Sequence, residues 1–338
     1  MNILAKSGYK YLINDIGNLL HKNRTKTIQY VNNILVETYW YIGKRIVEFE
    51  QKGNEKAEYG SKLLKQLSKD LSLSYGKGFS RSNIQYMRLI FIKYPKCQTL
   101  SGKLSWSHYV ELLTISDDLT RSFYKKQCVN ENWSVRELKR QRNSGLFERL
   151  ALSKDKKGVL ELSKNGQMIT SGENIVKDPY IFEFLGIPEK HRYSEKELES
   201  KLIDNMEQFL LELGKGFAYI GRQYRITLNN THNFVDLVFY HRILKCFVLI
   251  DLKIGKVNHQ DIGQMNLYLN YFKAEENVKN DNAPIGIVLG ADKDSIFVEY
   301  ALSSISNQLF VSKYQLYLPD KKILQSELSM LLQAARKN

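Results

Sequence analysis

The chain has 338 residues, and 43% of them are hydrophobic, which is enough for two domains with real cores. Its formal net charge of +14 favours a polyanionic partner, most simply nucleic acid, although a surplus of lysine that only aids solubility would give the same value. Three cysteines without metal-ligand spacing and the lack of a membrane-length apolar run argue against a disulfide framework, a zinc knuckle and a membrane partner, and predict a cytoplasmic protein.

The first half of the chain predicts helices. Between Tyr30 and Gln51, apolar residues recur at steps of three and four, which places them on one helical face. Further helices are expected at 60–72, from Ser80 or Ser82 to Pro95, at 105–114, at 117–130, and from the S-x-x-E capping box at 134–137 to about 150. Residues 1–152 are therefore predicted to form a helical N-terminal domain.

Two of these helices carry a basic face. The third helix presents Arg81 and Arg88, and the last presents Arg136, Lys139, Arg140 and Arg142. Such a face can bind a phosphate backbone or be an ordinary solvated surface, because no base-reading side chain is identifiable from the sequence. We take Arg136, Lys139 and Arg140 as candidate nucleic-acid contacts.

The second half predicts an α/β domain behind a linker. Residues 153–177 are polar and rich in Gly, Ser and Lys, which is typical of a linker or a surface excursion. In 178–338 we expect a helix at 195–213, three strands, a helix from about 260, a strand at 285–291, a helix at 296–305, an edge strand at 314–318 and a helix at 325–336. A mixed sheet flanked by helices follows.

Two of the three successive strands, FVDLVFY and CFVLIDL, each contain one aspartate among apolar residues. If they pair antiparallel across the turn HRILK, Asp236 lies opposite Asp251, although this turn lacks an Asn-Gly or Asp-Gly signal and the register could slip by one residue. Lys253 follows Asp251 at the strand period of two and shares its face. Two acids and one base then converge, and Mg²⁺ or Mn²⁺ would neutralise the acids.

The pattern of Asp236 followed by Asp251-Leu252-Lys253 resembles the motif of the PD-(D/E)XK nuclease superfamily. The segments LLELGKGFAYIGRQY, FVDLVFYHR, GQMNLYL and APIGIVLGADKD are similar to the YhcG-like nuclease family, as are YWYIGKRI, LSKDLSLSYGKGFSRSNIQYMR and NWSVRELKRQ in the first half. The resemblance covers nearly the whole chain. It implies a restriction-endonuclease-like domain that hydrolyses phosphodiester bonds with Mg²⁺ or Mn²⁺.

The resemblance also implies roles for single residues. The metal ligands would be Asp236, Asp251, the backbone carbonyl of Leu252 and a glutamate of the helix at 195–213; Glu199 matches, while Glu195, Glu197 and Glu207 compete for the role. Lys253 would steer the attacking water. Aspartate at position 251 stands where glutamate is commoner, so its shorter reach bears on the ligand geometry and on activity.

Further site residues follow from the strand before the motif and the helix after it. Gln264 and Tyr268 share one helix face and match a Gln-x-x-x-Tyr element of the superfamily, in which Gln264 would orient water or phosphate and Tyr268 would hold the nucleic-acid backbone. A surface amide and a packing phenol are the alternatives. Other candidate nucleic-acid contacts are Arg222, which could instead pair with an acid, Gln223 and Lys256.

The predicted function is a metal-dependent nuclease, most simply acting on DNA. The alternatives are a nuclease-fold module that binds nucleic acid or a partner without cutting, or a scaffold in DNA repair, recombination or defence. The presence of Asp236, Asp251 and Lys253 together favours catalysis over binding alone. Two neighbouring carboxylates cost stability without a metal, and a module that only binds has no need to keep them. Whether DNA or RNA is cut, and whether the chain forms a homo-oligomer, stays open. His259 as a general base is a further alternative.

Overall fold

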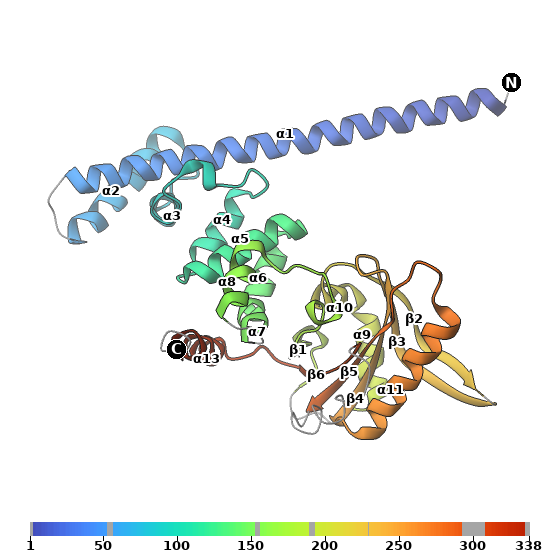
Figure 1. Cartoon of the computed structure of the whole chain (residues 1–338). Helices are drawn as coiled ribbons and strands as arrows, with labels where there is room; N and C mark the ends of the chain where they lie inside the picture. Colours follow the sequence, from blue (N-terminus) through green and yellow to red (C-terminus); the bar gives the residue numbers. More distant parts are fainter. Residues whose placement is uncertain are drawn as a thin grey trace. The chain divides into compact units, whose positions relative to one another are not determined.

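Figure 1 shows the computed structural model of the chain, which divides by packing into a first unit, Met1–Lys139, and a second unit, Arg140–Asn338. The residues that the structure describes are 3–52, 57–152, 156–188, 193–228, 230–292 and 308–334. Within these ranges, we find no helix with both the length and the apolar character needed to cross a lipid bilayer.

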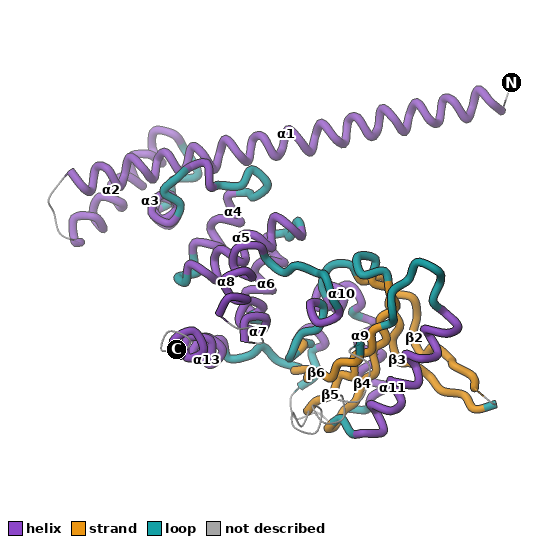
Figure 2. Tube along the Cα trace, viewed as in Figure 1, coloured by secondary structure: helices purple, strands orange, loops and turns teal. Residues whose placement is uncertain are grey.

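The first unit is helical, as the sequence predicts (Figure 2). Its elements are α1 (Ile3–Lys52), α2 (Ala57–Tyr75), α3 (Arg81–Lys93), the 3₁₀ turn Cys97–Thr99, α4 (Trp106–Leu113), α5 (Asp118–Glu131) and most of α6 (Val135–Asn143). The α1 helix begins well before the predicted start, but among the α1 side chains whose burial the structure describes, the first buried one is Val36. A Cβ atom on Gly43 of α1 would lie 1.7 Å from the backbone oxygen of Met87 in α3, so only glycine permits this close helix packing.

The second unit is built on a mixed six-stranded sheet. Its elements are α7 (Leu146–Leu152), α8 (Lys156–Asn165), β1 (Tyr180–Ile181), α9 (Glu195–Asp204), α10 (Met206–Leu213), β2 (Phe217–Leu228), β3 (Thr231–His241), β4 (Cys246–Lys256), α11 (His259–Tyr271), a π-helical turn (Phe272–Glu276), β5 (Ile285–Asp292), β6 (Leu309–Gln315) and α13 (Lys321–Ala334), with 3₁₀ turns at Gly172–Asn174 and Glu183–Leu185. The strand order is β1-β6-β5-β4-β3-β2. The pairs β2–β3 and β3–β4 are antiparallel, and the other pairs are parallel.

Helices cover both faces of this sheet, so its central strands are buried on both sides. On one face, α9 and α10 pack Leu198, Leu202 and Phe209 against alternate residues of β3, β4 and β5. On the other face, α11 packs Ile262 and Met265 against the opposite side of the same strands. The predicted mixed sheet flanked by helices is confirmed. The aspartates Asp236 of β3 and Asp251 of β4 stand among the apolar residues of these strands and are therefore candidates for function.

Several boundaries differ from the predictions. The strand β6, predicted at the sheet edge, lies between β5 and β1. The edge strand is β1, which the sequence does not predict because two residues are too few to show a strand period. The helix expected at 195–213 breaks at Asn205, which caps both α9 and α10. The helix expected to reach 150 breaks before Gly145, whose φ of +64° ends α6 as glycine commonly does. The helix predicted at 296–305 lies outside the described residues.

The segment expected as a linker is folded. Residues 156–165 form α8, and the buried side chains of Val159, Leu162 and Ile175 belong to the second unit. By packing, the division of the chain falls at 139/140, inside α6, whereas the sequence places the boundary at 153–177. The buried residues Val159, Leu162 and Ser163 of α8 follow helical spacing, but they stand among Gly, Ser and Lys residues, and this composition is more typical of a linker.

A buried ion cluster ties α6 and α7 to the sheet. Glu212 of α10 is 0% exposed, and its carboxylate contacts Arg149 at 2.9 Å and Arg140 at 3.3 Å while accepting the Ile181 backbone N–H at 3.0 Å. Burial alone would raise the pKa of Glu212, but the charges of Arg149, Lys177 and Arg140 outweigh it and lower the pKa to about 2. This cluster is a part of the fold that the sequence analysis does not foresee.

Candidate active site

The two aspartates of β3 and β4 are adjacent. The ladder runs from His241–Cys246 to Leu237–Ile250, which is the predicted register, so Asp236 and Asp251 occupy the next opposed positions. Four residues link the strands, and Lys245 closes the turn with a φ of +50°, which explains the absence of an Asn-Gly signal.

The Asp236 side chain takes the place of a ladder partner. Its Oδ2 atom accepts the backbone N–H of Leu252 at 2.8 Å. In a strand, the N–H and C=O of one residue point to the same side, so the carbonyl of Leu252 also faces β3 and the aspartates. Local strand geometry therefore directs a third oxygen toward the two carboxylates.

Asp251 is buried and incompletely compensated. It is 2% exposed, and its Oδ2 atom lies 2.8 Å from Lys253 Nζ, an ion contact; within the described residues, nothing donates a well-aligned hydrogen bond to this oxygen. Burial and the charge of Asp236 raise the pKa of Asp251 to about 7, although Lys253 opposes the shift. The carboxylate pair thus holds more negative charge than its protein surroundings balance.

Lys253 is held by two carboxylates, one of which the sequence analysis misses. Its Nζ atom lies 2.8 Å from Asp251 Oδ2 and 3.8 Å from Asp261 Oδ1. Burial opposes a charged lysine, but Asp251 prevails and raises the pKa of Lys253. Asp261 also accepts the Asn258 backbone N–H at 2.8 Å in the capping box of α11. The N-x-x-D spacing before an apolar helix is the signal that could have identified it.

Glu199 reaches the site through a glutamine. It is 7% exposed on α9, and Gln223 Nε2 of β2 donates to Glu199 Oε2 at 2.8 Å and to Asp236 Oδ1 at 3.0 Å. Burial raises the pKa of Glu199, and the hydrogen bond from Gln223 opposes the shift. Of the competing glutamates, Glu207 is exposed, while Glu195 accepts the Ile254 N–H at 3.4 Å.

The Gln-x-x-x-Tyr element lies beside the aspartates, but its tyrosine is not accessible. Tyr268 is 0% exposed, and its hydroxyl donates to the Phe234 carbonyl at 3.0 Å and accepts from Gln264 Nε2. Because this hydroxyl is buried and already bonds to β3, a contact between Tyr268 and a nucleic-acid backbone would require the side chain to move, and that contact stays a prediction. Gln264 is exposed.

Comparison with known proteins decides the family. The chain is 39% identical over 354 residues to "Putative nuclease YhcG" of Escherichia coli (strain K12), covering 95% of this chain and 94% of that protein. This chain belongs to the YhcG-like nuclease family. Residues 173–329 match the family described as the YhcG PDDEXK nuclease domain, and residues 15–149 match the DUF1016 N-terminal domain. The restriction-endonuclease-like fold predicted for the second half is confirmed.

Two solved structures are also similar to this YhcG-like chain. The crystal structure of a repair endonuclease from Pyrococcus abyssi matches 39% of this chain and 50% of its own, with 19% identity and a TM-score of 0.26. The structure of EndoMS in apo form matches 39% of this chain and 49% of its own, with 17% identity and a TM-score of 0.26.

The remaining predicted contacts of the YhcG-like chain lie in different settings. Arg222 and Lys256 are exposed in the second unit, and Arg136 and Lys139 are exposed on α6 in the first unit. Arg140 is not a free basic residue, because its side chain is 16% exposed and pairs with Glu212 and Glu183. Its role as a nucleic-acid contact stays a prediction. His259 is exposed at the start of α11.

The oxygen atoms at this site fit a magnesium or manganese ion better than a zinc ion. Asp236, Asp251 and the Leu252 carbonyl offer hard donors, and the raised pKa of Asp251 marks a negative charge that a cation would balance. The described residues contain no group of three or more His, Cys, Asp or Glu side chains arranged to hold a metal. A site with two carboxylates suits Mg²⁺, which usually keeps several waters.

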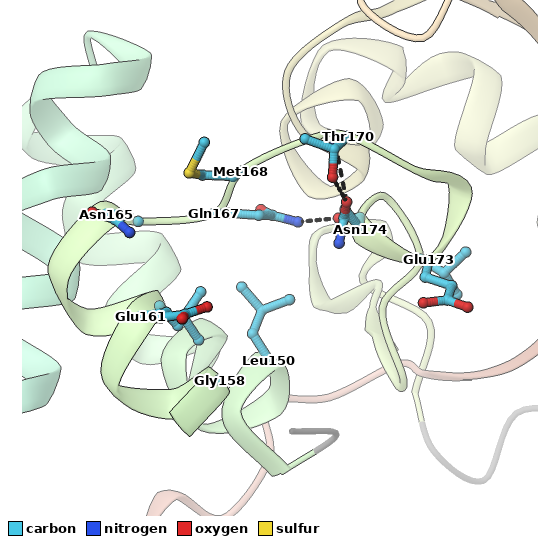
Figure 3. A pocket seen from close by; sticks show the side chains of 12 residues that line it. Leu150, Gly158, Glu161, Asn165, Gln167, Met168, Thr170, Glu173 and Asn174 are labelled. Carbon is cyan, nitrogen blue, oxygen red and sulfur yellow. Dashed lines mark hydrogen bonds between the residues drawn. The ribbon is translucent and has the colours of Figure 1, made fainter. Parts of the chain in front are cut away.

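A separate pocket lies between α7, α8 and the segment that follows α8 (Figure 3). Its volume is about 200 Å³, and none of the predicted site residues lines it. Gln167 donates to the Asn174 carbonyl at 2.5 Å, and Thr170 donates to Asn174 Oδ1 at 2.9 Å. Because these polar groups bond to one another, they stabilise the turn that follows α8, and the pocket is a weaker candidate for a reaction site than the aspartates of β3 and β4.

Proposed function

We propose that this chain is a metal-dependent nuclease that hydrolyses phosphodiester bonds in DNA. The observation that carries the proposal is the convergence of Asp236, Asp251 and Lys253 at the point where the β3–β4 ladder ends. A carboxylate pair with uncompensated charge is expected where a cation completes a site. The three cysteines are free, which suits action in a reducing cytoplasm.

In this proposal, Asp236, Asp251 and the Leu252 carbonyl hold Mg²⁺ or Mn²⁺. Glu199, which Gln223 links to Asp236, would join them as a further ligand only when the ion is bound. The bound ion would neutralise charge on the scissile phosphate and favour deprotonation of water. Asp236 is fixed by the Leu252 N–H, so one backbone amide sets the position of its carboxylate before substrate binds. The Asp251 side chain is 2% exposed, so the packing around it restricts its position.

Lys253 orients the attacking water and stabilises negative charge on the phosphate. Its ammonium lies 2.8 Å from Asp251 Oδ2, beside one of the carboxylates that would hold the cation. Asp261 holds the same ammonium from the other side. The amide nitrogen of Gln264 donates to the Tyr268 hydroxyl, so its exposed amide would orient a water through its oxygen.

Exposed cations supply contacts to the nucleic-acid backbone. Arg222 and Lys256 provide them in the second unit, and Arg136 and Lys139 provide them in the first. The formal net charge of +14 supports a polyanionic substrate. Contacts of this kind add affinity that falls steeply with salt but carry little sequence information.

The test is cleavage of supercoiled plasmid, branched and single-stranded DNA and structured RNA, with Mg²⁺, Mn²⁺ or EDTA, by wild type, Asp251→Ala and Lys253→Ala. Metal-dependent cutting that both variants lose supports the proposal and identifies the substrate. Salt-sensitive binding without cutting, unchanged in both variants, would contradict it. The function would then be binding through basic residues such as Arg136 and Lys139.

A further inference from the structure

Gln223 has an unusual backbone conformation for a residue inside a strand. Its φ is +47°, in the left-handed region that side chains other than glycine, asparagine and aspartate seldom adopt. The register of β2 against β3 also shifts between Tyr219 and Gly221, which inserts one residue, Ile220, three positions before Gln223. A residue held in this way costs about 1 kcal/mol and persists only where its surroundings determine it.

The side chain of Gln223 explains why this conformation is retained. Its Nε2 atom donates to Glu199 Oε2 at 2.8 Å and to Asp236 Oδ1 at 3.0 Å. Both partners are carboxylate oxygens, which only accept hydrogen bonds, so the amide must present its nitrogen to them. One amide of β2 therefore links α9 to β3 at the centre of the candidate site.

The amide uses the two oxygens that a shared cation would need. Magnesium binds oxygen at about 2.0–2.1 Å, so an ion held by both carboxylates would lie between them. The Gln223 nitrogen already lies within hydrogen-bond distance of each. Asp236 does not depend on it for position, because its other oxygen accepts the Leu252 N–H at 2.8 Å.

We propose that Gln223 is a positioning residue that bridges Glu199 and Asp236 in the metal-free protein and yields their facing oxygens to a divalent cation. This inference rests on the proposed function, since it takes these carboxylates as ligands. In the metal-free protein, the amide supplies two donors to neighbouring carboxylates and reduces their repulsion. When the cation binds, those donors compete with it.

Calorimetric titration of the full chain with Mg²⁺ and with Mn²⁺ tests the competition without measuring cleavage. Gln223→Ala removes the competing donors and is expected to bind the cation about tenfold more tightly than wild type, since hydrogen bonds to charged groups must no longer be broken. Equal or weaker binding would overturn the inference, because the amide would then be neutral toward the ion or would orient its ligands.

A matched pair of variants separates the amide from the backbone strain. Gln223→Ala removes the amide but keeps the strain of the positive φ, +47°, whereas Gln223→Gly removes both. The two variants should bind the cation equally tightly. If only Gln223→Gly bound more tightly than wild type, the gain would come from strain relief and the inference would fail.

A second measurement does not need a folded variant at position 223. In ¹⁵N-labelled wild type, Mg²⁺ should move the side-chain NH₂ signals of Gln223 toward those of a solvent-exposed glutamine and speed their exchange with water. Signals that stay in place while Mg²⁺ binds would overturn the inference.

The outcomes also separate this inference from the proposed function. If wild type binds neither ion, or if Asp251→Ala leaves binding unchanged, the proposed function fails and this inference fails with it. If wild type binds and Asp251→Ala does not, but Gln223→Ala binds no more tightly, only the inference about Gln223 fails.

Discussion

The second unit contains two buried clusters of charged side chains that balance their charges differently. In one, Glu212 is surrounded by Arg149, Lys177 and Arg140, and its pKa falls to about 2. In the other, Asp251 lies beside the Asp236 carboxylate and contacts the Lys253 ammonium, which also contacts Asp261, and the pKa of Asp251 rises to about 7. Both carboxylates are nearly inaccessible, so burial alone does not account for the opposite shifts.

The difference separates a structural cluster from a candidate site. Around Glu212 the protein supplies all the compensating charge, and the cluster is complete on folding. Around Asp251 the compensation is partial, which costs stability unless another cation joins. Such an imbalance is expected where function, more than stability, determines the residues. Substitutions in the two clusters should therefore act on different measurements.

The largest expected effect is on cleavage. Lys253→Ala removes the cation nearest the carboxylate pair and should slow single-turnover cleavage by about 10³-fold, or about 4 kcal/mol in the barrier. Lys279→Ala removes the same charge from an exposed lysine of the second unit and should leave the rate unchanged. A Lys253→Ala protein that cuts at the wild-type rate would make Lys253 only an ion-pair partner of Asp251.

The next effect is on stability. Glu212→Gln leaves buried cations without their carboxylate and should lower the free energy of unfolding by about 3 kcal/mol. Urea unfolding followed by far-UV circular dichroism measures the loss. The three tryptophans, at 40, 106 and 133, all lie in the first unit, so their fluorescence reports that unit separately. Glu207→Gln, exposed on the same helix, is the control and should change stability by less than about 0.5 kcal/mol.

Acid should remove the Glu212 contribution gradually. The folded-state pKa of about 2 lies below the ordinary 4.5, so the stabilisation is fully present above pH 4.5 and is lost as pH falls toward 2. Its full value is about 3 kcal/mol by linkage. Wild type and Glu212→Gln should therefore converge in stability across this range. Parallel curves would mean that the carboxylate titrates as it does in the unfolded chain.

The contrast between the clusters also shows what sequence can predict. The register that opposes Asp236 and Asp251 follows from two apolar strands joined by a short turn, and the strand period places Lys253 on the same face as Asp251. These are local relations. Family resemblance supplies the fold and adds Glu199, whose buried side chain does reach the site through Gln223.

Contacts between distant segments could not be predicted. Arg140 looks like part of a basic helix face, and its partner Glu212 is 72 residues further along the chain. In the sequence, Tyr268 looks available to contact substrate, but in the fold its hydroxyl donates to the Phe234 carbonyl of β3. The bridge made by Gln223 depends on an extra residue in β2, at position 220. The adjacent Gly221 is typical of such a bulge, but it does not indicate which side chain will then face Asp236.

The smallest expected effect is the one that most sharpens the comparison. In EDTA, Asp251→Asn removes an uncompensated charge and should raise the free energy of unfolding at pH 8 by about 1 kcal/mol, since the loss of the Lys253 contact offsets part of the gain. The folded-state pKa of about 7 is raised from 3.8, so wild type loses stability as pH rises between these values, and the variant should not.

Thermal unfolding across that pH range measures both curves, with Asp204→Asn, an exposed aspartate of α9, as the control that should match wild type. Added Mg²⁺ should stabilise wild type and leave Asp251→Asn unchanged, because only wild type retains both carboxylates. An Asp251→Asn protein that is less stable than wild type at pH 8 in EDTA would mean that Asp251, like Glu212, is fully compensated by the fold. The two clusters would then be of one kind, and the charge imbalance could no longer support a cation site.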